Sequence, residues 1–242
     1  MKKEEILKLF AGSIRSILEG SGLDFELVHE IRLRIYKPLI VIFAGREVFL
    51  DSRGKAVSDP VRAYLVTPRE VKETLEYIAN YSIYAYEDEL KQGFITVQGG
   101  HRVGVAGKIM TEGEKIKGIK YISYINVRIS HQIKGCATEV LPCLFGTEGI
   151  CHTLIISAPR CGKTTMLRDL VRQLSDGTQE YPGCTVGVVD ERSEIGGCYM
   201  GIPQNDVGIR TDILDCCPKA EGMMMLVRSM APSIIAVDEI GS

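Results

Sequence analysis

Apolar and polar residues alternate in several short runs along the first half of the chain. In residues 28–36, VHEIRLRIY, isoleucine and leucine alternate with arginine, which predicts a strand with one buried face. Runs at 39–45 and 47–51, the latter closed by the turn DSRGK, predict further short strands. Segment 93–109 carries Gly-Gly between two strand-like halves and predicts a hairpin, and 119–130 predicts another strand.

Apolar residues at helical spacing appear in the same half. Residues 1–20 carry such a stripe, formed by Ile6, Phe10, Ile14 and Ile17. This stripe predicts an amphipathic helix packed against a core, with docking on a membrane surface as the alternative. Thr67 and Glu70 form a capping box with Pro68 at the first helical position, which predicts a helix to about residue 80. A second short helix is expected within 81–92.

The pattern changes after residue 132, where apolar runs are continuous. Three such runs are the length of a strand: CHTLIIS at 151–157, TVGVV at 185–189 and SIIAV at 233–237. They predict strands buried on both faces. Helices are predicted around 137–145, 163–174 and 218–230. Alternating strands and helices predict a mostly parallel sheet with helices on both faces.

Two domains are therefore expected. Residues 1–132 are predicted to form a smaller α+β domain and 133–242 an α/β domain, with HQIKGCA, 131–137, as the linker. On the helix at 218–230, apolar residues at helical spacing predict the core-facing side; they are Ala220, Met224, Val227 and Ala231. The run Met223–Met225 is expected to pack in the core, with a binding surface as the alternative.

Composition removes several classes of protein. With 242 residues and 45% hydrophobic residues, the chain is long enough and apolar enough to bury a core. A net charge of −2 and a pI of about 6.1 do not favour a nucleic-acid-binding surface. No apolar run reaches the ~20 residues that span a bilayer, and charged residues interrupt the start, so no signal peptide is predicted. The 8 cysteines form no CxxC pair, which favours reduced thiols in the cytosol over a zinc site or disulfides.

The segment SAPRCGKT lies directly between an apolar strand-like run and an amphipathic helix, as a phosphate-binding loop does. Backbone amides from Arg160 to Thr165 are expected to converge on the phosphates of ATP at the positive end of the helix. Lys163 would reach the β- and γ-phosphates, and the Thr164 hydroxyl would ligate Mg²⁺. The predicted cofactor-binding set is Ser157, Ala158, Pro159, Arg160, Cys161, Gly162, Lys163, Thr164 and Thr165.

Ser157 stands where this motif normally begins with glycine. If the φ angle of Ser157 is negative, the replacement costs little; if positive, it costs about 1 kcal/mol. Cys161, inside the loop, is a thiol whose alkylation is expected to block nucleotide binding.

The apolar run SIIAV ends in Asp238 and Glu239, as a Walker B strand does. Asp238 is predicted to hold the magnesium shell, and Glu239 to act as the general base on the attacking water. The alternative is a strand that ends in solvated acids.

Long stretches of the chain resemble the stage III sporulation protein AA family. The resemblance is carried by VDERSEIGGCYMGIPQNDVGIRTDILDCCPKAEGMMMLVRSMAPSIIAVDEIG, by EIRLRIYKPL, by YSIYAYEDELKQGFITVQGGHRVGVAGK and by INVRIS. It implies a mother-cell ATPase of endospore-forming bacteria, which is cytoplasmic and bound to a membrane through membrane-embedded sporulation channel proteins.

A wider resemblance is to the ATPases of type II and type IV secretion and of pilus machines. It implies a P-loop fold of the RecA/AAA type, in a homo-oligomeric ring such as a hexamer with nucleotide between subunits. It also implies that Arg102 and Arg128 reach a neighbour's nucleotide and neutralise charge on the γ-phosphate. The alternative places both arginines on a solvated strand face.

In those relatives an acidic box follows the strand after the P-loop helix, and VVDERSE occupies that place here. Asp190, Glu191 and Glu194 follow the carboxyl end of a parallel strand, where ligands bind in open α/β sheets. These three carboxylates are therefore predicted to position water or Mg²⁺, with Asp190 and Glu191 as the nucleotide-site residues and with capping or pairing to Arg192 as the alternative. The loop from 193 to 208 carries no obvious secondary structure and is expected to contact another subunit.

Relatives continue past the Walker B strand, so an incomplete, C-terminally truncated P-loop sheet is expected. The leading hypothesis is Mg²⁺-dependent ATP hydrolysis that drives a secretion-like channel during endospore formation. One alternative is a nucleic-acid-dependent ATPase, which the slight acidity disfavours. The other is a scaffold that binds ATP without turnover, which the presence of Glu239 disfavours.

Overall fold

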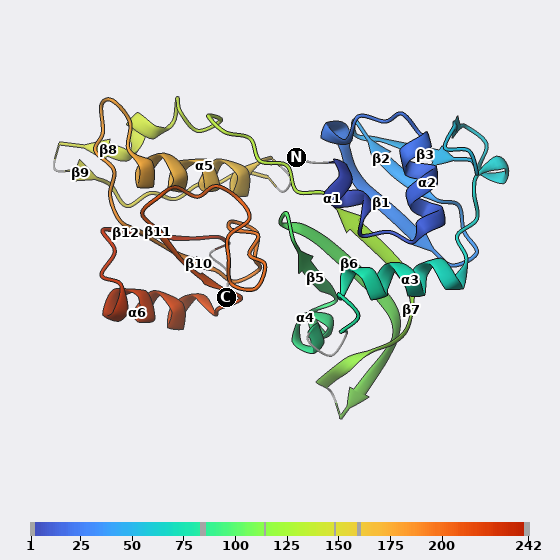
Figure 1. The fold of residues 1–242 in the computed structure, drawn as a ribbon. Coiled ribbons are helices and arrows are strands. Elements are labelled where there is room, and N and C mark those ends of the chain that lie inside the picture. Colours follow the sequence, from blue (N-terminus) through green and yellow to red (C-terminus); the bar gives the residue numbers. More distant parts are fainter. Residues whose placement is uncertain (1–2, 83–85, 114, 148, 159–160, 240–242) are drawn as a thin grey trace. The chain divides into compact units, whose positions relative to one another are not determined.

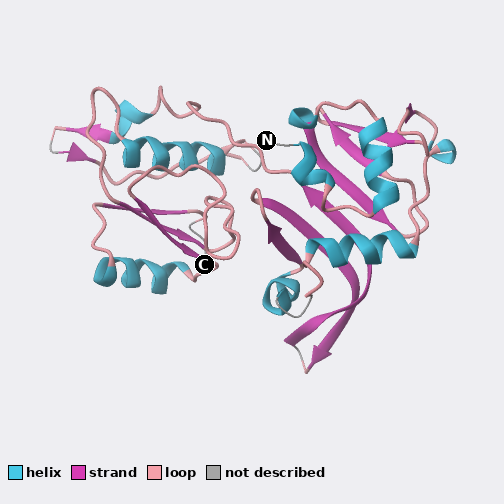
Figure 2. Cartoon of the chain, in the orientation of Figure 1, coloured by secondary structure: helices cyan, strands magenta, loops and turns pink. Residues whose placement is uncertain are grey.

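A computed structural model describes residues 3–82, 86–113, 115–147, 149–158 and 161–239 (Figure 1). The chain divides into two compact units, residues 1–131 and 132–242. Helices and strands occur in both units (Figure 2). Among the helices of the described residues, none combines the length and the apolar character needed to cross a membrane.

The first unit is built on a 7-stranded antiparallel sheet of order β4-β3-β2-β1-β7-β6-β5. Its strands are β1 Val28–Arg34, β2 Ile40–Phe43, β3 Arg46–Leu50, β4 Ala56–Val57, β5 Phe94–Val97, β6 His101–Glu112 and β7 Lys115–Arg128. The predicted strands of this half are confirmed, and so is the hairpin: β5 and β6 pair across Gly99 and Gly100, whose φ angles are 87° and 71°. Glycine adopts such angles without a steric penalty.

Helices and single 3₁₀ turns accompany this sheet in the described residues. They are α1 Lys3–Leu7, α2 Gly12–Gly20, α3 Pro68–Ile78, α4 Glu87–Gln92, η1 Phe25–Leu27 and η2 Pro60–Arg62. The capping box of α3 is confirmed, since the Thr67 side chain accepts from the Glu70 N–H and Glu70 accepts from the Thr67 N–H. The predicted N-terminal helix buries its apolar stripe but is broken in two. The Arg15 guanidinium donates to the carbonyls of Leu7, Lys8 and Phe10 and thereby satisfies the end of α1.

The second unit contains a 3-stranded parallel sheet of order β11-β10-β12. Its elements are α5 Lys163–Asp176, β10 Val186–Asp190, β11 Thr211–Asp215, α6 Lys219–Ser229 and β12 Ile234–Val237, with η4 Leu141–Leu144 and a small hairpin of β8 Phe145–Gly146 and β9 Gly149–Ile150. Helices α5 and α6 lie on opposite faces of this sheet (Figure 1). The predicted parallel sheet covered on both faces is thus confirmed.

Two predicted elements of this unit were wrong. Residues 151–157 form no strand, because no backbone ladder pairs with them in the described part of the chain. Leu154 and Ile156 are 63% and 82% exposed, although Ile155 packs against the core. The helix expected around 137–145 is a turn followed by the short η4. Strand β11 was not predicted, because TDILD has polar residues at three of its five positions.

The core-facing side of α6 was also predicted wrongly. Its buried residues are Gly222 and Leu226, whereas Met224 and Val227 are 52% and 53% exposed. A Cβ atom at position 222 would come within 2.6 Å of a Val189 methyl carbon, so glycine allows the helix to approach β10 closely. Met225 is half exposed as well, which contradicts core packing of the methionine run.

Candidate nucleotide-binding site

The phosphate loop, residues 157–164, leads into the N-terminus of α5. Gly162 is the N-cap of the helix and has a φ angle of 83°, a conformation that favours glycine. The Lys163 ammonium donates to the carbonyls of Ser157 and Ala158, at 3.1 Å and 3.2 Å. Ser157 does not have a positive φ, and the missing first glycine therefore costs little. Pro159 and Arg160 lie outside the described residues.

The hydroxyl of Thr164 and the carboxylate of Asp238 meet at this end of the sheet. Thr164 Oγ1 donates to Asp238 Oδ2 at 3.0 Å, across 74 positions of sequence. The first turn of α5 carries the threonine, and the aspartate follows the last residue of β12. A hydroxyl and a carboxylate are hard oxygen donors of the kind that Mg²⁺ prefers, so the pair fits a magnesium ion. Cys161 is exposed beside it, and Thr165 is partly buried.

Glu239, the predicted base, has a left-handed backbone with a φ angle of 51°. Strained residues of this kind cluster at functional sites. Its N–H donates to Asp238 Oδ1 at 3.0 Å, and its carboxylate pairs with Arg192 Nη1 at 2.9 Å. Both side chains of the ion pair are at least half exposed, so the pair adds little stability.

Asp190, which was predicted to position water or Mg²⁺, binds the loop that follows it. It is fully buried at the end of β10 and accepts the backbone N–H groups of Glu194, Ile195 and Gly196 at 2.8–2.9 Å. Burial raises the pKa of its carboxyl group to about 6, although these hydrogen bonds act in the opposite direction. Both oxygens thus hold the following loop, which corresponds to the capping alternative. Glu191 pairs with the Lys219 ammonium instead.

A small pocket lies at this edge of the sheet. It is lined by Glu191, Arg192, Lys219, Asp238 and Glu239. The structure thereby brings the acidic box and the end of β12 together beside the first turn of α5. Three acidic and two basic side chains share the pocket, and the two ion pairs just described satisfy both cations.

The loop that follows Asp190, residues 193–208, lacks helices and strands but is well fastened. The Ser193 hydroxyl accepts the N–H of Cys198 at 3.0 Å, and the Asn205 amide donates to the Ile195 carbonyl at 3.0 Å. Between these contacts, Tyr199 and Ile202 form a β-bridge that closes a tight turn. At its tip Met200 is 83% exposed.

Arg168 is a residue of this region that the sequence analysis missed. It lies one turn after Thr164 on α5 and is only 8% exposed. Its guanidinium donates to the Ile195 carbonyl at 2.8 Å and to the Glu194 carbonyl. A lone arginine in an amphipathic helix carries no distinctive spacing, so its sequence offered no signal for this contact.

Arg102 and Arg128 belong to the first unit, where they are direct register partners on β6 and β7. The Arg102 guanidinium carbon lies 3.6 Å from the Phe94 ring centroid, and Arg128 Nε lies 4.0 Å from Glu30 Oε1. The two cations therefore lie on the same face of the sheet. Their action on a neighbour's nucleotide stays a prediction.

Comparison with solved structures supports the P-loop fold. The chain is similar to the X-ray structure of the Legionella pneumophila ATPase DotB, with 16% identity, a TM-score of 0.55, and coverage of 95% of this chain and 59% of that chain. It is also similar to the pilus retraction motor PilT with bound ADP, with 14% identity, a TM-score of 0.53, and coverage of 100% and 61%. The chain spans less than two thirds of each of these proteins. The α/β fold of secretion ATPases, predicted from the sequence, is thus confirmed.

Comparison with sequences identifies the family. The chain is 46% identical to stage III sporulation protein AA of Bacillus subtilis (strain 168) over 241 residues, which cover 98% of this chain and 73% of that protein. The family model described as sporulation stage III, protein AA, matches residues 1–242. The chain therefore belongs to the stage III sporulation protein AA family.

Proposed function

We propose that the chain binds ATP with Mg²⁺ and hydrolyses it. The observation that carries the proposal is the 3.0 Å contact between Thr164 Oγ1 and Asp238 Oδ2, beside a glycine-capped helix and the Lys163 ammonium. A hydroxyl, a carboxylate, an ammonium and a helix N-terminus are the groups that hold a metal-bound triphosphate in P-loop proteins. The ADP bound to the similar pilus motor accords with this assignment.

Each side chain has a defined part in the reaction. Lys163 exchanges its carbonyl partners for phosphate oxygens, and the amides at Cys161–Thr165 donate to the same anion. Thr164 and Asp238 would hold a magnesium ion, which would neutralise charge on the phosphates. Glu239 accepts a proton from the attacking water, and for this it has to leave Arg192. Arg102 and Arg128 supply positive charge to the nucleotide of a neighbouring copy.

Membership of the family supports a setting for this activity. We propose an N-terminal α+β domain, residues 1–132, and an ATPase domain, residues 133–242, working in a homo-oligomeric ring. The ring is placed on the cytoplasmic, mother-cell side of a membrane, attached through membrane-embedded sporulation channel proteins. ATP turnover would then drive a secretion-like channel during endospore formation.

Two substitutions in the full-length protein test ATP binding and turnover separately. Lys163→Ala is expected to abolish binding of a fluorescent ADP analogue, and Glu239→Gln to bind ATP while turnover falls at least ~100-fold. Glu221→Gln, an exposed carboxylate outside the pocket, serves as the matched control. Unchanged binding by Lys163→Ala contradicts the proposal.

The same assays decide between the remaining functions. Binding without turnover in the wild type supports an ATP-gated scaffold instead. Turnover that requires DNA or RNA and falls steeply with salt supports a nucleic-acid-dependent ATPase.

A further inference from the structure

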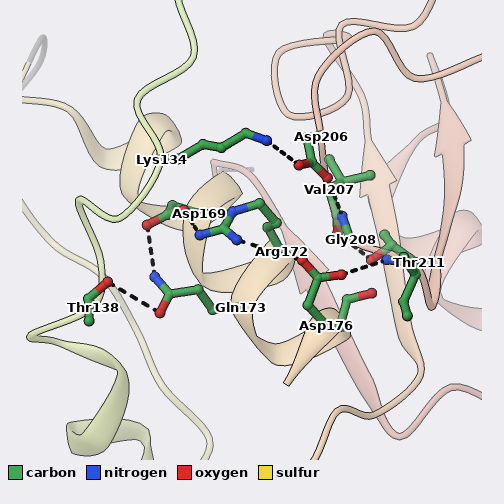
Figure 3. A network of polar contacts seen from close by, with 12 residues as sticks. Lys134, Thr138, Asp169, Arg172, Gln173, Asp176, Asp206, Val207, Gly208 and Thr211 are labelled. Carbon is green, nitrogen blue, oxygen red and sulfur yellow. Dashed lines mark hydrogen bonds and ion pairs between the residues drawn. The ribbon is translucent and has the colours of Figure 1, made fainter. Parts of the chain in front are cut away.

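The segment that leaves the first unit, residues 132–138, is fastened to α5 and to the end of the 193–208 loop (Figure 3). The linker, predicted at residues 131–137, is defined by these contacts as residues 132–138. On α5, the Ala137 N–H donates to Asp169 Oδ2 at 2.9 Å, and the Thr138 hydroxyl contacts Gln173 Oε1 at 3.4 Å. Closer to the phosphate loop, Cys136 Sγ lies 3.7 Å from the Thr165 carbonyl oxygen. The linker therefore runs along the helix that begins at the nucleotide site.

Asp169 is the centre of these contacts. It is 2% exposed, and both of its oxygens face N–H donors. Oδ1 accepts Nε and Nη2 of Arg172 at 3.0 Å and 2.7 Å, and Oδ2 accepts Ala137 N–H and the Gln173 amide at 2.9 Å and 2.8 Å. One of these four hydrogen bonds joins the helix to the linker, and the other three stay within α5. Together they keep the pKa of Asp169 low in spite of burial.

A second fastening holds the linker to the loop, through Asp206. The Gln132 side-chain amide makes two hydrogen bonds with the backbone of Asp206. Nε2 donates to the Asp206 carbonyl at 2.7 Å, and Oε1 accepts the Asp206 N–H at 3.0 Å. Lys134 adds an ion pair with the Asp206 carboxylate. We call these contacts of Gln132 and Lys134 the Asp206 clasp.

Helix α5 therefore connects three parts of the second unit. Its first residues, Lys163 and Thr164, face the proposed phosphate site, Arg168 holds the start of the 193–208 loop, and Asp169 holds the linker. A packed helix moves as a rigid body. A shift of the first turn of α5 is therefore transmitted to the loop and the linker, which are bonded to its second turn.

We propose that Asp169, together with the Asp206 clasp, is a positioning element that couples nucleotide binding at the phosphate loop to the order of the linker. This inference rests on the proposed function. Nucleotide binding withdraws Lys163 from the Ser157 and Ala158 carbonyls and so changes the start of α5. The linker contacts of Asp169 then change with it. Coupling between two sites is reciprocal, so loosening the linker weakens nucleotide binding by the same factor.

Amide hydrogen exchange at Ala137 measures the contact directly, because that N–H is the group bonded to Asp169. In the full-length protein, Mg–ADP is expected to slow exchange at Ala137 roughly fivefold or more. In Asp169→Asn the slowing of exchange at Ala137 by Mg–ADP should fall below about twofold. Asparagine has one accepting oxygen and one donating NH₂ group, so it cannot accept the donors that face both oxygens of Asp169. The affinity for Mg–ADP should drop roughly fivefold in the same variant.

Two references separate coupling from general stabilisation. Exchange at Val188, in the centre of β10, reports the stability of the sheet and should respond to Mg–ADP alike in wild type and variant. Asp176→Asn is the matched control on the same helix, since Asp176 pairs with Arg172 and accepts the Ile209 N–H but does not contact the linker. It should leave the response at Ala137 unchanged.

Should Asp169→Asn fail to fold, Gln132→Ala combined with Lys134→Ala opens the Asp206 clasp without burying a new group. This double variant is expected to reduce the slowing at Ala137 by at least half. The inference is overturned if Mg–ADP binds to the wild type but leaves Ala137 unaffected, or if the variants respond as the wild type does. A wild type that binds no nucleotide instead contradicts the proposed function.

Discussion

Thr164 and Asp238, 74 positions apart in sequence, are joined by a hydrogen bond of 3.0 Å between a hydroxyl and a carboxylate oxygen. Asp238→Asn removes the charge and one oxygen donor from this pair. Turnover of ATP should fall at least ~100-fold, and the Mg²⁺ concentration for half-maximal activity should rise, because magnesium loses an anionic partner. A magnesium titration of the steady-state rate measures both.

Thr164→Ser is the control for that substitution, since it keeps the hydroxyl and removes only a methyl group. Its magnesium dependence should match that of the wild type. An Asp238→Asn protein with normal turnover at low magnesium would show that Asp238 does not contact the metal.

The ion pair between Arg192 and Glu239 leads to a second prediction. Arg192→Gln should leave the affinity for ADP unchanged and raise basal turnover about twofold to fivefold. The exposed ion pair stabilises the paired position of the Glu239 carboxylate by up to ~1 kcal/mol, and its loss frees Glu239 to act on water. Steady-state kinetics and ADP titration measure the two quantities. Arg192→Lys keeps the positive charge and should stay near the wild-type rate. A large fall in turnover would instead assign Arg192 a direct part in the reaction.

His101 predicts a pH-dependent stability of the first unit. It is buried, and burial, with a smaller contribution from His131, lowers its pKa from 6.5 to about 4. The unfolded chain therefore takes up a proton at higher pH than the folded one, and stability is lost as the pH falls from 6.5 towards 4. The lowered pKa corresponds to a loss on the order of 3 kcal/mol.

Chemical denaturation of the first unit at pH 7 and pH 4.5 tests this. His101→Asn places an amide oxygen where His101 Nδ1 accepts the Ser130 N–H, and it removes the titrating ring. The variant should show a much smaller difference between the two pH values. Asp190, in the second unit, changes stability in the opposite sense, since its raised pKa favours the folded state as the pH falls through 6. An equal pH dependence in variant and wild type would contradict the assignment to His101.

Cys161 provides a chemical test of the phosphate loop. Its thiol is exposed immediately before Gly162, so alkylation adds bulk where phosphates are proposed to bind. Treatment with N-ethylmaleimide should abolish ADP binding, and prior saturation with Mg–ADP should slow the reaction at this residue. Cys161→Ser should bind ADP and resist inactivation, although other exposed cysteines, such as Cys143, still react. Inactivation of that variant would place the effect at another thiol.

Local patterns of the sequence were sufficient for much of the fold. The capping box of Thr67 and Glu70 starts α3 as predicted, and Gly99-Gly100 turns the hairpin between β5 and β6, because both depend on residues close in sequence. Segment 151–157 has the composition of a strand, yet a strand also needs a neighbouring backbone, and the described residues provide none. The prediction of the buried side of α6 was wrong for a related reason. It used the larger apolar residues, whereas the close contact with β10 needs a glycine, Gly222.

The candidate site divides in the same way. Thr164 and Asp238 were predicted to meet because each follows from a motif with a fixed place in the fold. The hydrogen bonds of Asp190 depend on the path of the irregular loop that follows it, and the bond of Asp169 to the linker depends on a segment 32 positions away in sequence. The sequence predicts such paths poorly, because an aspartate that binds backbone N–H groups cannot be distinguished by residue type from one that acts in catalysis.

The buried carboxylate of Asp190 has one more effect. By binding three consecutive N–H groups of the 193–208 loop, it orders a segment that would otherwise sample many conformations. The turn between Tyr199 and Ile202, on which Met200 and Ile202 are exposed, is consequently preorganised. Association of a partner with this turn would therefore cost little conformational entropy in the loop itself.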